Sequence, residues 1–295
     1  MLYDMHCHLD FSADAGRIAR QAAGRIAAMS ATVSPDAYER AVRVLDAPGI
    51  RVGLGLHPWQ AAGPGFASAA DRFAALAPRC AFIGEVGLDF SARHAATREA
   101  QQRAFDRVVR ACAAPRVFGD GESEGAASCD GGPEGGASCD GEPEGGAGRA
   151  APACGMVSIH AVRAVDEAVD AFARAGVLEG ASRHAPARVA GRVLVLHSFN
   201  GTSDQLNRAL DAGFFFSAGP RMLATKRGRA YVRALPADRL LVETDAPARE
   251  GEPFSFDAWH DGVKAAVEAL AAARGQDPHA LRERLAETSA RILGL

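Results

Sequence analysis

Short apolar runs alternate along this chain with longer segments of helical character, and this alternation constrains the fold more than any other feature. The apolar runs comprise residues 2–6, 26–33, 50–56, 80–86, 156–160, 193–197, 214–217 and 240–243. Two of the segments between them, residues 95–113 and 162–175, place apolar side chains three or four positions apart. Near-continuous apolar strands separated by helices indicate a parallel sheet that is covered by helices.

Eight such units in one chain favour a closed TIM (β/α)₈ barrel over an open, doubly wound sheet, which is the alternative α/β fold. A length of 295 residues fits one large barrel. The chain is 48% hydrophobic and 23% charged, as expected for a globular protein with a large core. A formal net charge of −3 argues against a protein that coats nucleic acid non-specifically.

One segment, residues 119–153, breaks the alternation. It is rich in Gly, Glu, Pro and Ser, and it contains two similar units, CDGGPEGGAS from Cys129 and CDGEPEGGAG from Cys139. This composition cannot bury enough apolar area to offset the entropy of ordering, so we expect a disordered, low-complexity insertion. Its place between the fourth helix and the fifth strand puts it on the N-terminal face of the barrel. A Ca²⁺-binding repeat is less favoured, because Asp130 and Asp140 have few other ligands nearby.

The predicted organisation is therefore a single barrel domain formed by residues 1–118 and 154–295. The opening sequence MLYDMHCHLD has neither the basic nor the apolar region of a signal peptide, and no run approaches about 18 apolar residues. The six cysteines include no CxxC pair, which argues against a structural zinc ribbon. We expect a cytoplasmic protein with reduced thiols and no membrane association.

Metal-ligand side chains stand at the ends of several predicted strands. His6 and His8 end the first strand, and residues i and i+2 of a strand point to the same side, so both imidazoles face one site. In a parallel barrel the carboxyl ends of all strands meet at one rim, where residues distant in sequence become neighbours. The expected ligands at this rim are His6, His8, Glu85, His160, His197 and Asp245.

Four imidazoles and two carboxylates suit divalent Zn, Mn, Mg or Fe, and the sequence leaves the identity of the metal open. Six protein ligands exceed what one tetrahedral site with an open position requires, so we expect two metal ions per subunit. The alternative is that these side chains merely fill the mouth of the barrel. That arrangement would bury two carboxylates with no cation to offset the cost.

These residues and their neighbours resemble the motifs of the TatD-like metal-dependent hydrolases, which are often described as deoxyribonucleases. The motifs, in family order, are His6-Cys7-His8-Leu9-Asp10, Gly55-Leu56-His57-Pro58, Gly84-Glu85-Val86-Gly87-Leu88-Asp89, Ile159-His160, His197-Ser198-Phe199-Asn200-Gly201 and Glu243-Thr244-Asp245-Ala246-Pro247. The resemblance implies a TIM barrel in which His6, His8 and Asp245 hold one metal. It implies that His160 and His197 hold the other, with Glu85 as the bridge.

A bridging carboxylate is also expected on independent grounds. Related binuclear hydrolases bridge their metals with a carbamylated lysine at the end of the fourth strand, whereas the only lysines here are Lys226 and Lys264, far downstream. Glu85 is the group available. The expected reaction is hydrolysis of DNA phosphodiesters by a metal-bridging hydroxide, with Glu85 and Asp245 as catalytic residues. Asp245 would orient the attacking water and accept its proton.

Several other residues are expected around the rim. His57 is either a substrate or supporting contact, or a structural hydrogen-bonding group in the turn before Pro58. Glu243, two residues before Asp245, could orient a ligand from behind. Asp89 is expected to buttress its loop. Arg221 and Lys226 follow the seventh strand, where barrels often bind phosphate, and are candidate substrate contacts. Four histidines lack a strand-end position and are expected at the surface: His94, His184, His260 and His279.

Two departures from the family pattern fall around substrate binding. The arginine that often follows two residues after the strand-five histidine is replaced by Val162, and the stretch 248–252 after the last motif is short and acidic. These departures keep open hydrolysis of a small-molecule ester or amide on the same binuclear site. The expected partners are accordingly DNA or a small phosphoester or ester substrate. An inactive scaffold is disfavoured because all six ligands are present.

Overall fold

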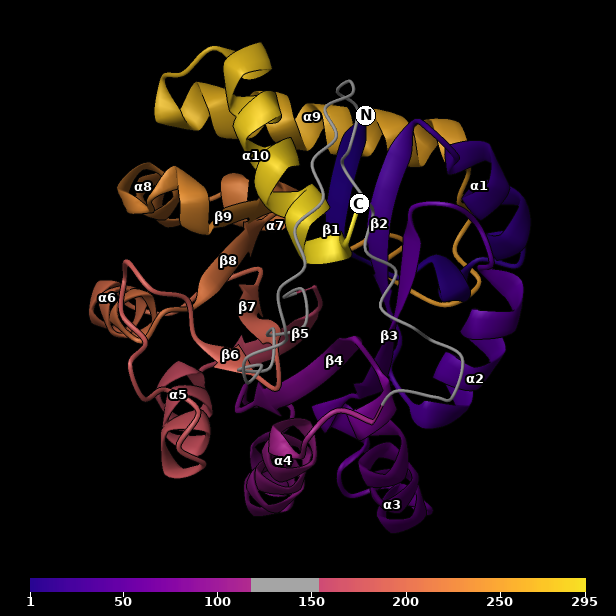
Figure 1. Cartoon of the computed structure of the whole chain (residues 1–295), viewed down its shortest axis with the longest axis vertical. Helices are drawn as coiled ribbons and strands as arrows, with labels where there is room; N and C mark the ends of the chain where they lie inside the picture. Colours follow the sequence, from indigo (N-terminus) through magenta and orange to yellow (C-terminus); the bar gives the residue numbers. More distant parts are fainter. Residues whose placement is uncertain (118–153) are drawn as a thin grey trace, which may run out of the picture.

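The computed structural model describes residues 1–117 and 154–295, so the expected insertion at 119–153 lies outside the described residues. Within those ranges, the strands form a nearly closed barrel of eight parallel strands that neighbour one another in chain order (Figure 1). They are β1 (Leu2–Cys7), β2 (Ile26–Ala31), β3 (Ile50–Leu56), β4 (Phe82–Asp89), β5 (Met156–Val162), β7 (Arg192–His197), β8 (Phe215–Ala218) and β9 (Leu240–Val242). All eight predicted strands are present, which confirms the TIM barrel and excludes the doubly wound alternative. A short strand, β6 (Arg188–Val189), pairs antiparallel with β7.

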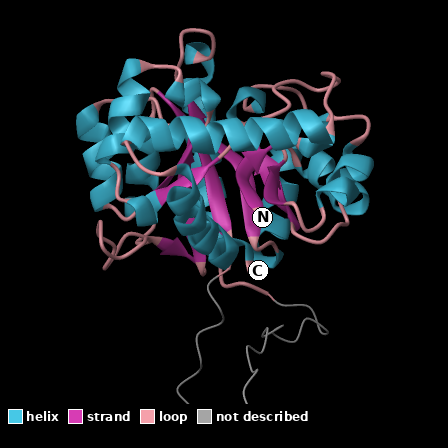
Figure 2. Cartoon of the chain, turned by 90° about the horizontal axis from the view of Figure 1, so that it is seen from above, coloured by secondary structure: helices cyan, strands magenta, loops and turns pink. Residues whose placement is uncertain are grey.

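Helices surround the strands on the outside (Figures 1 and 2). They are α1 (Ala15–Ala22), α2 (Pro35–Val44), α3 (Phe66–Leu76), α4 (Arg98–Ala113), α5 (Val165–Arg174), α6 (Ser203–Asp211), α7 (Pro220–Leu223), α8 (Lys226–Ala234), α9 (Phe256–Arg274) and α10 (Pro278–Leu293). Single 3₁₀ turns add η1 (Leu9–Phe11), η2 (Pro58–Gln60), η3 (Ala77–Arg79), η4 (Ala95–Thr97) and η5 (Ala237–Arg239). The two segments predicted as helical, 95–113 and 162–175, contain α4 and α5, each beginning three residues later than its segment.

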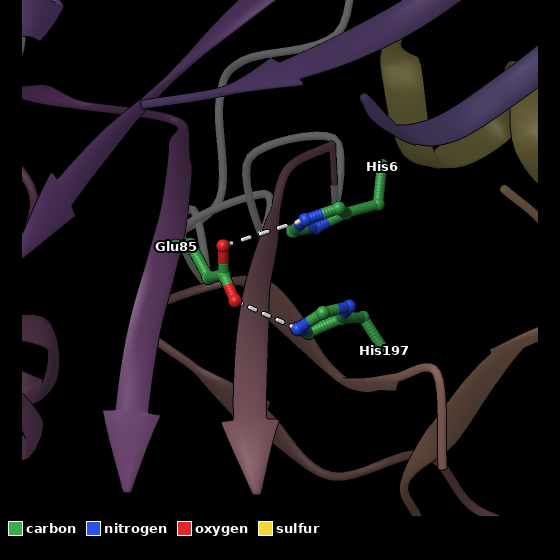
Figure 3. Close-up of side chains that lie close together, drawn as sticks. All are labelled: His6, Glu85 and His197. Carbon is green, nitrogen blue, oxygen red and sulfur yellow. Dashed lines mark hydrogen bonds and ion pairs between the residues drawn. The ribbon is translucent and has the colours of Figure 1, made fainter. Parts of the chain in front are cut away.

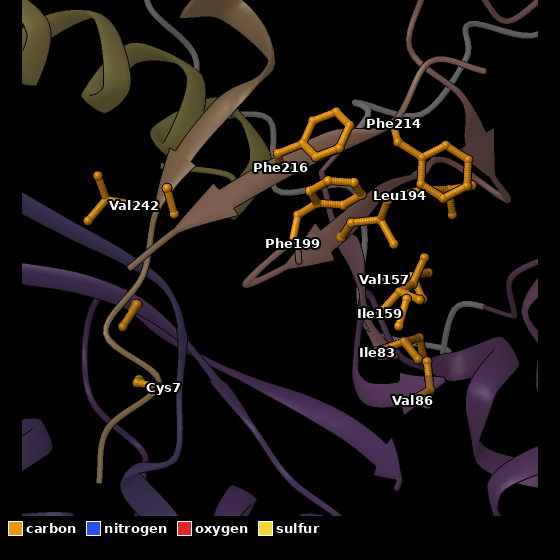
Figure 4. Packing of buried hydrophobic residues seen from close by; sticks show 14 of the residues in the cluster. Cys7, Ile83, Val86, Val157, Ile159, Leu194, Phe199, Phe214, Phe216 and Val242 are labelled. Carbon is orange, nitrogen blue, oxygen red and sulfur yellow. The ribbon is translucent and has the colours of Figure 1, made fainter. Parts of the chain in front are cut away.

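The core has two parts, as the period-two geometry of strands requires. Along β7, Leu194 and Leu196 point outward and pack under the helices, whereas Val193 and Val195 point into the barrel. Figure 4 shows part of the outer cluster, where side chains from neighbouring strands interlock. Both faces of the strands are therefore apolar, which explains why their sequences are nearly uninterrupted apolar runs.

The barrel closes between β9 and β1 through the loop that follows β9. The backbone N–H of Asp245 donates to the carbonyl of His6 at 2.9 Å, and that of His8 donates to the carbonyl of Ala246 at 2.9 Å. Behind them, the buried carboxylate of Asp4 accepts hydrogen bonds from both the backbone and the hydroxyl of Thr244. It also accepts one from Trp259 Nε1 of α9 at 2.8 Å. These bonds hold Thr244 and Asp245, in the loop after β9, beside the end of β1.

Strand β4 is longer than predicted and carries an irregularity at its centre. The pairing register of β4 with β5 shifts between Ile83 and Val86, and the backbone N–H of Glu85 donates to the carbonyl of Thr32 on the β2 side. Glu85 therefore lies within the strand, not at its end as predicted, because the strand continues to Asp89. A bulge of this kind re-aims one side chain, and here it leaves Glu85 buried at the mouth of the barrel.

Candidate metal centre

The six predicted ligands converge on the carboxyl-end rim of the barrel. His6, Glu85, His160 and His197 lie on four different strands, and His8 and Asp245 lie in the loops after β1 and β9. Figure 3 shows His6 and His197 on the same side of Glu85, each facing one of its carboxylate oxygens, and the two rings are stacked with their centroids 4.1 Å apart. All six side chains are buried or nearly so. Three overlapping groups of donor atoms gather within 4.8 Å of one another: His6, Glu85 and His197; His6, His8 and Asp245; and His57, Glu85 and His160.

The two carboxylate oxygens of Glu85 face two different sets of imidazoles. Oε1 lies 2.6 Å from His160 Nδ1 and 2.8 Å from His197 Nε2. Oε2 lies 3.7 Å from His6 Nε2 and 3.4 Å from His8 Nε2. One carboxylate is thus shared between two groups of nitrogen donors, which is the arrangement that a bridging ligand requires.

The group formed by His6, His8 and Asp245 is compact enough to enclose a cation. The Nε2 atoms of His6 and His8 are 3.3 Å apart, and Asp245 Oδ1 lies 3.7 Å from the former and 3.4 Å from the latter. Three donor atoms with these separations can all lie roughly 2.0–2.3 Å from one point, which is the range of Zn–N and Zn–O bonds. Glu85 Oε2 also faces the two nitrogens.

Contacts to the Nδ1 atoms, on the far side of the two rings, fix the orientation of the His6 and His8 imidazoles. His8 Nδ1 lies 2.9 Å from the carbonyl oxygen of Ala31, which can only accept, so Nδ1 donates and Nε2 of the neutral ring carries a lone pair. His6 Nδ1 lies 2.7 Å from the hydroxyl of Ser158 on β5. Such contacts behind ligating imidazoles set ring orientation and are typical of metal sites.

The second group consists of Glu85 Oε1, His160 and His197, whose facing nitrogens are 3.2 Å apart. Its supporting contacts are carboxylates. Asp89 Oδ2 lies 3.5 Å from His160 Nε2, and Glu243 Oε2 lies 3.9 Å from His197 Nδ1. With three donor atoms from the protein, this group leaves positions for water or a substrate oxygen.

The electrostatics of the cluster favour cations. Although burial opposes ionisation, the imidazoles of His57 and His197 hold the pKa of Glu85 well below its usual value. Burial, assisted by His197, lowers the pKa of His6 to about 4, which keeps that ring neutral. Burial also disfavours a charge on His8, yet hydrogen bonds to Asp245 and Glu85 raise its pKa to about 10. The carboxylates therefore draw positive charge into the cluster, and the donor set fits divalent metal ions.

Backbone strain gathers at the same rim. Among the non-glycine residues with positive φ are Arg163, Ser198 and Asp245, which follow β5, β7 and β9 with φ of 53°, 46° and 56°. Left-handed backbone costs energy for residues with a Cβ, although Asp tolerates it better than most. The turn at Asp245 directs its carboxylate toward His6 and His8 while its N–H closes the barrel.

His57 combines the two roles between which the sequence could not decide. Its Nδ1 accepts from the backbone N–H of Trp59 in the turn at Pro58, so the proton of the neutral ring is on Nε2. Nε2 lies 3.2 Å from Glu85 Oε1. In this tautomer His57 donates to Glu85, and its Nε2 offers no lone pair to a metal.

Of the two expected phosphate contacts, Arg221 and Lys226, only Arg221 lines the cavity above the cluster. Arg221 Nη1 donates to Asp245 Oδ2 at 2.7 Å, and Arg221 lines the cavity above the cluster. Lys226 is not among the described residues that line this cavity, whereas its neighbour Arg227 is. Arg227 is held by a hydrogen bond to the carbonyl of Asn200. Sequence reasoning missed Arg227. The directions in which side chains of the first helical turn point depend on the orientation of the helix axis, which the sequence does not give.

Glu243 is fully buried behind His197, on the side predicted for it. The hydroxyl of Ser217 donates to Glu243 Oε2. Burial, together with the charge of Asp245, raises the pKa of Glu243 well above its usual value. Asp89 buttresses its loop as expected, since its Oδ1 accepts from the backbone N–H of Ser91 at 2.8 Å.

The cavity above the cluster has a volume of about 470 Å³, within the range of small-molecule sites. Its floor includes Glu85, His160 and His197, and its walls include aromatic side chains that sequence reasoning did not single out: Phe11, Trp59, Phe199 and Tyr231. Phe11, Trp59 and Phe199 lie in short turns or loops that give no periodic signal in the sequence, and Tyr231 lies on α8. Val162, the departure from the family pattern, also lines the cavity.

Two of the four histidines expected at the surface, His94 and His260, are only partly exposed. His94 is only partly exposed, and its ring stacks on Trp59 at 5.0 Å with an interplanar angle of 10°. His184 and His279 are exposed as expected, and His260 is partly buried.

Fold and site together define a class: (β/α)₈ barrels that gather histidines and carboxylates into candidate metal centres at the carboxyl-end rim. The sequence matches the family described as "TatD related DNase" over residues 3–115 and 150–294. The chain belongs to this family, as its motifs indicated.

Curated relatives match over shorter stretches. "Deoxyribonuclease Tat-D" of Schizosaccharomyces pombe is 37% identical over 59 residues, which are 20% of this chain and 19% of the relative. "3'-5' ssDNA/RNA exonuclease TatD" of Dickeya dadantii is 35% identical over 106 residues, which are 33% of this chain and 40% of the relative. The chain therefore aligns with well under half of the length of these relatives.

Solved structures extend the likeness of the fold to the whole chain. A TatD homologue from Escherichia coli K12 superposes with a TM-score of 0.70 at 17% identity, covering 100% of this chain and 98% of its own. A TatD family hydrolase from Entamoeba histolytica gives a TM-score of 0.64 at 11% identity, covering 99% of this chain and 97% of its own. At these identities the likeness shows the shared barrel.

No helix in the described ranges is long and apolar enough to cross a membrane. The cytoplasmic location expected from the sequence stays a prediction, which fractionation of cells that express the protein would test.

Proposed function

We propose that this protein is a metal-dependent nuclease that hydrolyses phosphodiester bonds of DNA. One observation carries the proposal: the two oxygens of Glu85 face two separate groups of imidazole donors. Membership of the TatD related DNase family supports it, as do relatives whose names describe deoxyribonuclease and exonuclease activity. These relatives do not favour the hydrolysis of a small ester or amide.

We assign two divalent ions to the site. His6, His8 and Asp245 would hold one, His160 and His197 the other, and Glu85 would contribute an oxygen to each. When bound, such ions polarise a phosphoryl oxygen and make an attacking water more acidic. The protein supplies a rigid set of donors for them, because four of the six residues lie on barrel strands and the other two, His8 and Asp245, are held by the closure between β9 and β1.

The chain's own residues divide the remaining work. Asp245 is ionised, since a hydrogen bond from His8 lowers its pKa against the effect of burial, and it can orient the water and accept its proton. Arg221 holds the other oxygen of Asp245, and together with Arg227 it gives the cavity wall positive charge for a phosphate. His57 donates to Glu85 and keeps that carboxylate in place.

The test is an assay of the purified full chain on labelled single-stranded and duplex DNA, with Mn²⁺, Mg²⁺ or Zn²⁺ added and with EDTA as the matched control. We expect cleavage with at least one metal and none with EDTA. A panel of carboxylic esters, lactones and amides is assayed in parallel. DNA that stays intact with every metal while one of these compounds is hydrolysed would overturn the proposal. Metal analysis of the protein checks the expected ratio of two ions per chain.

A further inference from the structure

Trp59 is unusual because it is both exposed and fixed. Among the described Phe, Tyr and Trp residues it is the only exposed one, at 55%. Its indole Nε1 nevertheless donates to Asp89 Oδ2 at 2.6 Å, and its ring stacks on His94. Exposing a large apolar ring costs free energy, and tying it down costs further entropy. Both costs are explained if a ligand binds against the exposed face of the indole.

The position of Trp59 relates it to the metal centre. Its ring centroid lies 4.7 Å from that of His57 and 6.1 Å from that of His160, and both of these rings contact Glu85. Trp59 also lines the same cavity as Glu85. A group that lies on the indole is therefore a neighbour of a group that lies over the cluster.

The cavity offers two kinds of surface beside the candidate metal centre. Trp59 lies next to His57 and His160, whereas Arg221 lies against Asp245 and belongs, with Arg227, to the segment that follows β8. A nucleotide has matching parts, a planar base and a charged phosphate. Aromatic platforms beside basic side chains are how proteins hold the bases and the backbone of unpaired nucleic acid.

We propose that Trp59, backed by His94, is the stacking platform for the nucleobase adjoining the scissile phosphate. The proposal rests on the proposed nuclease function and assigns a base-binding subsite within it. The occupant is an unpaired base, because a base within a duplex has its faces covered by its neighbours. Stacking tolerates any base, so the subsite selects strand form and not sequence.

A second contact gives Trp59 a link to the metal centre. Asp89 Oδ2, which accepts from the indole, also lies 3.5 Å from His160 Nε2. A replacement of Trp59 could therefore act through Asp89 as well as through stacking. Trp59→Phe removes the indole N–H and keeps an aromatic face, whereas Trp59→Ala removes both. Comparing the two variants separates stacking from the effect on Asp89.

Binding is measured without turnover in the full-length Asp245→Asn protein. The chain has two tryptophans, and Trp259 is buried at 1% exposure, so quenching by a bound base reports on Trp59. We titrate a short oligothymidine and an abasic strand of equal length, and follow fluorescence together with the anisotropy of an end label. Quenching by the oligothymidine that exceeds quenching by the abasic strand is expected. If anisotropy shows binding of oligothymidine with no such difference, the subsite is refuted.

Turnover gives an independent measure in the protein with native Asp245. If one stacked base is lost, Trp59→Ala should lower kcat/KM by about 5- to 100-fold on a strand whose terminal nucleotide carries its base. The loss should be much smaller on a strand whose terminal nucleotide is abasic. Trp59→Phe should recover most of the loss. Val42→Ala, which trims an exposed side chain on α2 outside the cavity, is the control and should behave as the parent protein does.

The proposed nuclease function and the base-binding subsite can be refuted separately. A parent protein that binds and cuts no nucleic acid overturns the proposed function, and the subsite with it. A parent protein that cuts oligonucleotides, with Trp59→Ala losing equally on base-bearing and abasic ends, overturns the subsite alone. Equal losses in Trp59→Phe and Trp59→Ala would assign the effect to Asp89 and also overturn stacking.

Discussion

At the scale of single residues, Arg192 at the start of β7 shows how this fold accommodates a buried charge. It is fully buried, and its guanidinium donates to the backbone carbonyls of Cys80, Cys112 and Ala77 at 2.8, 3.1 and 2.7 Å. Cys112 lies in the last turn of α4, whose carbonyls carry partial negative charge. One side chain thus satisfies three carbonyls at the N-terminal face of the barrel.

Arg192→Met should therefore lower the free energy of unfolding by about 2–4 kcal/mol, because it leaves buried carbonyls without donors. Urea denaturation followed by circular dichroism measures the change. Arg192→Lys keeps the charge but cannot match the planar three-way geometry, so we expect an intermediate loss. A Met variant as stable as the parent protein would show that these bonds contribute nothing net.

Asp245 is the residue on which the proposed chemistry depends most. Asp245→Asn should lower turnover of DNA by about 100-fold or more, since loss of a proton acceptor typically costs 10²- to 10⁴-fold. The backbone N–H that closes the barrel is retained, so the fold should persist, as the thermal midpoint would show. The exposed Asp238→Asn, in η5, is the matched control. Activity equal to that of the parent protein would remove Asp245 from catalysis.

At the scale of elements, several helices that follow the rim loops begin with a side-chain cap. Helix α6, which follows His197, starts with a capping box, in which Thr202 accepts from the backbone N–H of Gln205 and the Gln205 side chain accepts from that of Thr202. Gln205 also donates to Asp166 at the start of α5. The cap thereby joins the helices behind His160 and His197.

Thr202→Ala should destabilise the protein by about 1 kcal/mol, the usual cost of losing an N-cap side chain. Thr202→Ser keeps the hydroxyl and should retain most of the stability. The two variants are compared by urea denaturation under identical conditions. If serine destabilises the protein as much as alanine does, the methyl group of Thr202, and not its hydroxyl, is the stabilising part.

At the scale of the whole molecule, the barrel separates the site from the point where residues 118–153 leave it. The described residues on either side are tied to the N-terminal face, because Val117 N–H donates to the carbonyl of Pro78 and Gly155 N–H to that of Ile292. The candidate metal centre lies at the opposite ends of the strands. In barrels of this kind the N-terminal face serves stability, while the carboxyl-end face carries the chemistry.

Deletion of residues 121–150 should accordingly leave kcat/KM within about twofold of that of the full chain. The free energy of unfolding should stay constant or rise by up to about 1.5 kcal/mol, because a shorter connection costs less closure entropy. Steady-state assays and urea denaturation check both expectations. A tenfold loss of activity with unchanged stability would place this segment at the active site.

Much of this protein could be predicted from its sequence, because the relevant signals are local. Apolar runs and helical spacing located all eight barrel strands, and the spacing of His6 and His8 placed both imidazoles on one face. Given a parallel barrel, strand ends had to converge, which brought Glu85, His160 and His197 together. The topology follows from the order of the elements, so distant residues could be placed without knowing the loops.

The tertiary structure alone decided how the loops meet across the rim. The bond between Arg221 and Asp245, the cavity position of Arg227 in place of Lys226, and the Trp59–His94 stack depend on loop backbone and helix direction. Asp4 closes the barrel against a residue 240 positions away. Periodicity records only which face of an element is apolar. Contacts between irregular segments arise once the barrel has closed, and these contacts shape the surface that substrate would meet.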